Sequence, residues 1–199
     1  QINVLSTAEL ISGTLTAADN ALVPFQVKET AHFADVAADA WYAESVYKAW
    51  ENGYVDGVAE GIFAPEQAMT RAEFAKLVAN MAGYGYSTEA SYPTKFADVP
   101  ADAWFAGAVE WAARYGIVTG TSETTFEPYG TITREQIATM LYRYAGNGAQ
   151  ADLSVLDQFE DADSISAYAE NAMAWAVENG YVNGTSDTTV APSDRKSVV

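Results

Sequence analysis

Phe96-Ala97-Asp98-Val99 opens the stretch of sequence that decides the fold, and Trp104, Gly116-Ile117-Val118, Phe126-Glu127-Pro128 and Thr133-Arg134-Glu135-Gln136 follow it in that order. The opening motif also occurs 63 residues earlier at Phe33 and, as Phe-Glu-Asp-Ala, 63 residues later at Phe159. Self-similarity at a fixed interval is the signature of tandem structural units. We therefore expect three copies of one unit.

The copies agree at further positions in the same order. The matching sets are Trp41, Trp104 and Tyr168; Gly53, Gly116 and Gly180; Gly57, Gly120 and Gly184; Pro65, Pro128 and Pro192; and Thr70-Arg71-Ala72-Glu73 with Thr133-Arg134-Glu135-Gln136. These matches divide the chain into an N-terminal extension (1–30), unit 1 (31–85), unit 2 (94–146) and unit 3 (157–199), with 84–95 and 147–157 as linkers.

Each complete unit is expected to hold two helices. The first helix is predicted over 41–52 and 104–115, with Asp39 and Asp102 placed to cap its free amides and a glycine to end it. The second helix is predicted to begin at a capping box, Thr70 with Glu73 or Thr133 with Gln136. Apolar residues follow each box at i, i+3, i+4 and i+7, which is typical of a helix with one buried face: Phe74, Leu77, Val78, Met81, and Ile137, Met140, Leu141, Tyr144.

Two segments depart from the repeat. Unit 3 is incomplete, because Ser197 and Val198 stand where the Thr-Arg start of the second helix is expected. In the N-terminal extension, residues 6–11 read as a capping box before apolar residues. This segment is interpreted either as a short helix that covers the surface left open by unit 3 or as an extended tether.

The composition excludes several classes of function. A formal charge of −17 with only ten Lys and Arg residues argues against nucleic acid and acidic membrane surfaces as partners. The absence of cysteine rules out disulfides and thiolate sites, and the sequence has no apolar run long enough to span a membrane. His32 is the only histidine and lies outside the repeated motif. No catalytic residues, metal ligands or cofactor are therefore predicted.

The ordered set of motifs resembles the S-layer homology domain family over roughly residues 32–193. In that family, three such units usually form a pseudo-threefold helical spindle whose inter-unit grooves bind secondary cell-wall polysaccharide, often carrying pyruvate ketals. The resemblance implies an all-α fold of tandem helix-loop-helix repeats. It also implies a non-catalytic module outside the cell that anchors a protein to the bacterial cell wall or S-layer, without insertion into the membrane.

The resemblance also implies a set of ligand-binding residues. Arginine can pair with the carboxylate of a ketal through two parallel hydrogen bonds, and an aromatic ring can cover the apolar face of a sugar. The implied set is Arg71, Arg134, Trp41, Trp104, Thr70, Thr133 and Tyr168. The residues themselves leave alternatives open: the arginines follow helix N-caps, where a solvated side chain is common, and the tryptophans are equally suited to a core.

The sequence suggests one test of this assignment. Replacing Arg71 and Arg134 together by alanine is expected to abolish polymer binding and to leave the fold intact.

The sequence is also compatible with two other functions. One is a helical-repeat scaffold that binds a protein, and the other is an accessory region of a hydrolase that acts on the wall.

Overall fold

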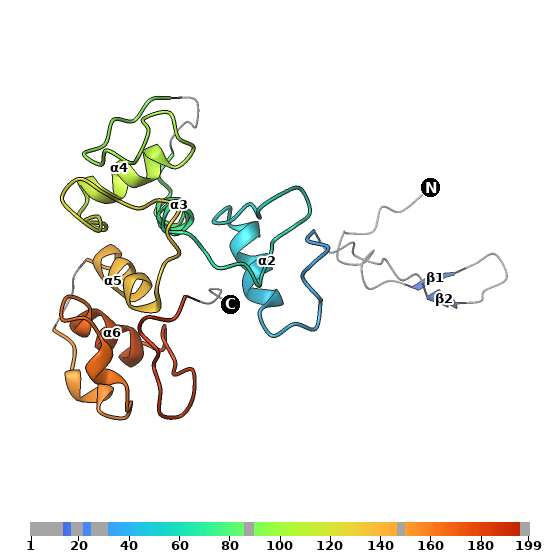
Figure 1. Cartoon of the computed structure of the whole chain (residues 1–199). Coiled ribbons are helices and arrows are strands. Elements are labelled where there is room, and N and C mark those ends of the chain that lie inside the picture. Colours follow the sequence, from blue (N-terminus) through green and yellow to red (C-terminus); the bar gives the residue numbers. More distant parts are fainter. Residues whose placement is uncertain (1–13, 17–21, 25–31, 86–89, 147–149, 196–199) are drawn as a thin grey trace.

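The computed structural model of the 199-residue chain describes residues 14–16, 22–24, 32–85, 90–146 and 150–195. The fold is mainly helical (Figure 1). Its elements are β1 (Thr14–Thr16), β2 (Leu22–Pro24), α2 (Ala43–Glu51), α3 (Arg71–Met81), α4 (Ala106–Arg114), α5 (Arg134–Tyr144), the short 3-10 helices η1 (Leu153–Leu156) and η2 (Ala162–Ser164), and α6 (Glu170–Glu178). Units 1 and 2 thus contribute two helices each, and α6 is the first helix of unit 3.

The second helices begin where the sequence predicts. The side-chain oxygen of Thr70 accepts a hydrogen bond from the amide of Glu73, and the Glu73 carboxylate accepts one from the amide of Thr70 at 2.7 Å. Thr133 and Gln136 form the same reciprocal pair at the start of α5. Both capping boxes are confirmed, and each satisfies two amides that the helix itself leaves without a partner.

The first helices are shorter than predicted, and the predicted aspartate caps are wrong. The N-cap residues are Tyr42 in α2 and Phe105 in α4, and neither makes a side-chain capping hydrogen bond. Asp39 and Asp102 lie too early, because a backbone turn stands between them and the helix. In that turn the amide of Ala106 donates to the carbonyl of Ala103 at 2.9 Å, so backbone takes over part of the capping role.

The aspartate of each Phe-x-Asp motif fastens the start of its unit to the Phe-x-Pro turn. The Asp98 carboxylate accepts hydrogen bonds from the amides of Phe126 at 2.8 Å and Glu127 at 2.7 Å. Asp35 and Asp161 make the same pair of bonds in units 1 and 3. The hydrogen bond from the Phe63 amide lowers the pKa of Asp35 below its usual value. The repeated aspartate is therefore a structural element, since it holds the left-handed residue at the turn, Glu127 with φ 57°.

The units interlock rather than stack as closed blocks. The second helix of one unit packs against the first helix of the next, so that α3 lies beside α4 and α5 beside α6 (Figure 1). Small residues line the α3–α4 contact and allow the two backbones to approach closely; among them are Ala72, Ala75, Ala79, Ala106, Ala108 and Ala112, all buried. The prediction that the units pack on one another is confirmed.

The predicted linkers contribute to the core. Tyr84 stacks on the buried Trp111 of α4, with ring centroids 5.5 Å apart. Leu156, which lies in η1, is buried in the cluster formed around α6. Each segment connects the second helix of one unit to the first helix of the next unit, and its residues pack against that first helix.

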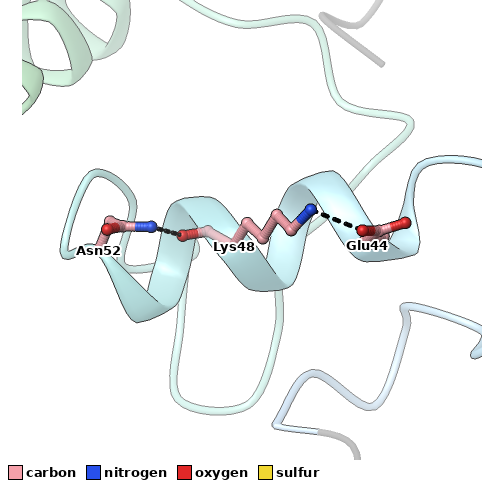
Figure 2. Close-up of polar contacts among 3 residues, drawn as sticks. All are labelled: Glu44, Lys48 and Asn52. Atoms are coloured by element: carbon pink, nitrogen blue, oxygen red, sulfur yellow. Dashed lines mark hydrogen bonds and ion pairs between the residues drawn. The ribbon is translucent and has the colours of Figure 1, made fainter.

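The helix α2 differs from α4 and α6 on the face that those helices turn toward the preceding unit. At the positions of Gly107 and Trp111 in α4, α2 carries Glu44 and Lys48. The two side chains form an exposed ion pair at 2.6 Å (Figure 2). Among the described residues no helix covers this face, so its polar composition matches its exposure.

The N-terminal extension contains an element that the sequence does not predict. Residues 14–16 (β1) pair antiparallel with residues 22–24 (β2), and Leu15 lies opposite Val23. The segment 6–12, interpreted above as a short helix or a tether, lies outside the described residues.

Candidate functional site

A groove of about 580 Å³ lies where unit 1 meets unit 2. Three parts of the chain form it: α2 with the loop that follows it, the first half of α3, and the turn before α4. The residues that line it include Val46, Asp56, Phe63, Met69, Lys76 and Trp104. Apolar side chains make up much of its wall, and charged groups converge at one point, as expected of a site for a small polar ligand with apolar faces.

Trp104 gives the groove an aromatic wall. Its side chain is 41% exposed, and its ring rests edge-on against the buried Phe105, with the centroids 5.0 Å apart. The ammonium group of Lys76 lies 5.8 Å from the centroid of the Trp104 ring. This distance is within the range of a cation–π contact. A partly exposed indole ring therefore lies beside a lysine at the boundary between the two units.

Lys76 is paired with an acidic residue of its own unit. Its ammonium group donates to the Asp56 carboxylate at 2.7 Å, and both residues line the groove. Lys76 is partly sheltered and Asp56 more open, with side chains 31% and 68% exposed. Glu73 also lines the groove, but its carboxylate is occupied by the capping box of α3.

Arg71 lies at the joint between units 1 and 2 and is not among the residues that line the groove. It is only 7% exposed, and its Nε donates to the carbonyl oxygen of Phe126 at 2.8 Å. Its guanidinium carbon lies 4.8 Å from the centroid of the Phe126 ring. Burial lowers the pKa of Arg71, while nearby Glu127 acts in the opposite direction. The alternative of a solvated arginine is therefore wrong here.

Arg134 makes the equivalent contact between units 2 and 3. Its Nε donates to the carbonyl of Val190 at 3.0 Å, and a terminal nitrogen donates to the carbonyl of Asn183 at 2.5 Å. Burial lowers the pKa of Arg134, although this side chain is more open than that of Arg71. We call this recurring contact the inter-unit joint. In it, the arginine side chain and the first two amides of a second helix donate to the proline turn of the next unit, residues 126–130 in unit 2 and 190–194 in unit 3.

The other predicted ligand residues are dispersed. Trp41 is 79% exposed and is not part of the groove. Thr70 and Thr133 are occupied as helix caps. Tyr168 is exposed, and its hydroxyl donates to Glu135 at 3.0 Å. Partial burial of that hydroxyl, together with its hydrogen bond, raises the pKa of Tyr168 to about 12. Of the predicted set, the groove contains Trp104 alone.

Two functional candidates, Lys76 and Asp56, are absent from the predicted set. Neither residue recurs, because unit 2 has Thr139 and Thr119 at the positions of Lys76 and Asp56. A different signal was available, since Lys76 is the only basic residue on the second helix of unit 1 after its N-terminal arginine. This isolated lysine could have been predicted as a binding residue even though unit 2 lacks it.

The sequence contains one histidine, and the structure places it outside the groove. This residue, His32, stacks on Trp50 at 3.9 Å between ring centroids. Within the same residues, no cluster of three or more His, Asp or Glu side chains has the arrangement of a metal site. No helix in the described part of the chain has the length and apolarity needed to cross a bilayer.

A comparison with protein-family models gives a match in each unit. The model described as "S-layer homology domain" matches residues 32–75, 95–138 and 158–195. Together these segments cover most of the chain and include every residue of the groove's first wall, α2 and its loop.

The chain is also similar to parts of several larger proteins. It is 32% identical over 175 residues to the "Surface-layer 125 kDa protein" of Lysinibacillus sphaericus, covering 87% of this chain and 14% of that protein. It is 31% identical to the "S-layer protein sap" of Bacillus anthracis, covering 92% of the chain and 22% of that protein. The "Exoglucanase XynX" of Acetivibrio thermocellus is 28% identical, over 83% of the chain and 15% of the enzyme. The chain thus spans less than a quarter of each of these relatives.

Proposed function

The chain belongs to the S-layer homology domain family, and from this premise we propose that it is a non-catalytic module whose groove binds a carboxylated polysaccharide of the bacterial cell wall. The family itself places the chain at the cell surface as an anchoring module. The proposal that a carboxylated polysaccharide is the ligand rests on the meeting of Trp104 and Lys76 in one groove.

The chemistry of the groove fits such a ligand. The apolar face of a sugar ring can lie on the exposed part of the Trp104 ring in van der Waals contact. A carboxylate on that sugar then reaches Lys76, which is sheltered enough to be screened less than a surface charge. The net charge of −17 opposes the approach of an anionic polymer. Physiological salt screens exposed charges beyond about 8 Å, so contact inside the groove outweighs repulsion at a distance.

Trp104 offers a direct test of the groove. Replacing it by alanine should weaken binding to purified cell-wall sacculi by about tenfold or more, because buried aromatic contacts carry much of the binding energy of an interface. Trp41 is the matched control, since it occupies the same position in unit 1 but lies outside the groove. Trp41→Ala should bind nearly as well as the unaltered chain in a sedimentation assay. Equal losses in the two variants would argue against this groove.

Removal of the polymer from the cell wall distinguishes polysaccharide binding from the alternative of a protein-binding scaffold. Sacculi stripped chemically of their secondary polymer should no longer retain the chain, while untreated sacculi should. Retention that is unchanged by this treatment would favour a protein or peptidoglycan partner over the polysaccharide.

A hydrolase role is the second alternative, because enzymes occur among the relatives. These enzymes are several times longer than the chain, which covers 15% and 17% of them. We expect no fall in turbidity when the chain alone is incubated with wall fragments. Lysis under those conditions would contradict a purely anchoring module.

We also propose that the units follow the pseudo-threefold spindle of the family. Support comes from the inter-unit joint, which occurs twice with the same bonds: Arg71 and Ala72 donate to the turn of unit 2, and Arg134 and Glu135 to that of unit 3. In the described part of the chain, the equivalent turn of unit 1, residues 63–67, receives no such helix. A third joint at this turn would close the ring.

The spindle predicts a gain in stability when a third joint is supplied. The sequence of residues 130–146, appended after Val199, should dock on the turn of unit 1 and raise the melting temperature by several degrees. About 1 kcal/mol shifts the melting temperature of a domain of this size by roughly 2–4 °C. A copy of the appended segment with its arginine replaced by alanine should give a smaller rise. No rise with either segment would contradict the closed ring.

A further inference from the structure

We propose that Asp56 is an internal competitor that occupies the carboxylate position of the groove and sets its affinity for acidic sugars. The inference rests on the proposed function and concerns the same groove. When a carboxylated sugar lies on Trp104, its carboxylate takes the place of Asp56 on Lys76, and Asp56 turns out to water. Asp56 is thus a specificity-determining residue and not itself a ligand contact.

The geometry supports an exchange of partners. The Asp56 carboxylate lies 2.7 Å from the Lys76 ammonium group, which is the place that an acidic ligand would need. Asp56 is the more exposed of the two, so it can leave the cation at little cost while Lys76 stays beside Trp104. An ion pair of this kind is worth little in water, and a carboxylate held in addition by ring stacking can displace it.

The loop that carries Asp56 is fixed in place. Gly57, the next residue, has φ 81°, and a Cβ atom there would lie 2.5 Å from the carbonyl oxygen of Ile62 and 2.8 Å from the Phe33 ring. Only the side chain of Asp56 therefore needs to move when the partner changes.

The same positions in unit 2 lack this competition. Thr119 and Thr139 replace Asp56 and Lys76 there, and the nearby cation is Arg143, which donates to the carbonyl of Ile117 at 3.4 Å. The carboxylate competitor thus accompanies the lysine of unit 1 and is absent where the lysine is absent. This correlation within one chain links Asp56 to the function of Lys76.

The experiment uses one ligand in two charge states. The 4,6-pyruvate ketal of methyl glucopyranoside carries a carboxylate, and its methyl ester is neutral and nearly the same in shape. Binding of both is measured by NMR titration of the indole signal of Trp104. Asp56→Asn should tighten binding of the acid by about three- to tenfold and leave binding of the ester unchanged. Lys76→Gln should remove the preference for the acid over the ester.

Glu44→Gln is the matched control, because Glu44 and Lys48 form a comparable ion pair at 2.6 Å on α2 (Figure 2) and neither residue lines the groove. It removes one negative charge from the same unit without touching the groove, so it should leave the affinity for the acid within about twofold. If Glu44→Gln and Asp56→Asn raise the affinity for the acid equally, the change in net charge explains the effect and the proposal is wrong.

The failure of this inference is distinguishable from failure of the proposed function. If the chain is retained by untreated sacculi but Asp56→Asn binds the acid no better than the unaltered chain, the competitor role is wrong and anchoring stands. If neither the unaltered chain nor Asp56→Asn is retained by sacculi or prefers the acid to the ester, the polysaccharide function is wrong as well.

Discussion

Replacing Arg71 by alanine should lower the free energy of unfolding by about 2–4 kcal/mol. The side chain is 7% exposed and bonds to the carbonyl of Phe126 in the next unit. Alanine leaves that buried carbonyl without its partner and empties the space beside the Phe126 ring. The result is measured by urea denaturation followed by tryptophan fluorescence.

Two variants calibrate this prediction. Arg134→Ala removes the same contact at a more exposed joint and should cost about half as much. Arg114→Ala removes only a surface ion pair with Glu110 and should stay within about 0.5 kcal/mol. If Arg71→Ala keeps full stability and loses polymer binding, the sequence-based assignment of Arg71 as a ligand residue is correct and the structural role is wrong. A destabilised variant that still binds would favour the reverse.

Replacing Gly120 by alanine should be at least as damaging, with a loss of about 3 kcal/mol or more. Gly120 has φ 85°, and an added Cβ atom would lie 2.5 Å from the carbonyl oxygen of Thr125 and 2.6 Å from the Phe96 ring. Relief of that clash requires either the backbone turn or a buried ring to move. We expect the melting temperature of the chain to fall by roughly 10 °C, as judged by circular dichroism.

Gly116 separates the clash from the backbone strain. It has φ 71°, close to that of Gly120, but no atom lies within 4 Å of the position where its Cβ atom would be. Gly116→Ala should therefore cost only the strain of a left-handed alanine, about 1 kcal/mol. Similar losses in the two variants would mean that the turn beside Gly120 adapts easily.

Local sequence patterns predict the helix starts that depend on side chains close in sequence. The capping boxes at Thr70 and Thr133 are confirmed because threonine and a residue three positions later satisfy each other's backbone without help from the rest of the fold. The caps expected from Asp39 and Asp102 are wrong because a backbone turn lies between them and the helix. Local sequence gives no sign of that turn.

The interlocking of the units and the groove depend on contacts across units, which the repeat pattern does not reveal. Arg71 is the first residue of α3, and nothing near it in the sequence indicates that its side chain bonds to Phe126, 55 residues away. Trp104 is recognised because it recurs, and the structure places it in the groove. Lys76 and Asp56 occur in one unit only, so the repeat pattern gives no sign of them.

The inter-unit joint bears on how such a chain gains or loses repeats in evolution. The border of a repeat in the sequence falls between α3 and α4, but the packed element is formed by those two helices together. Recombination that inserts or deletes one whole period adds or removes one arginine together with one turn. Each remaining arginine therefore still has a turn of the next unit to bond to. Proteolysis at that border, by contrast, would separate Ala75 and Ala79 from the helix that shields them from water.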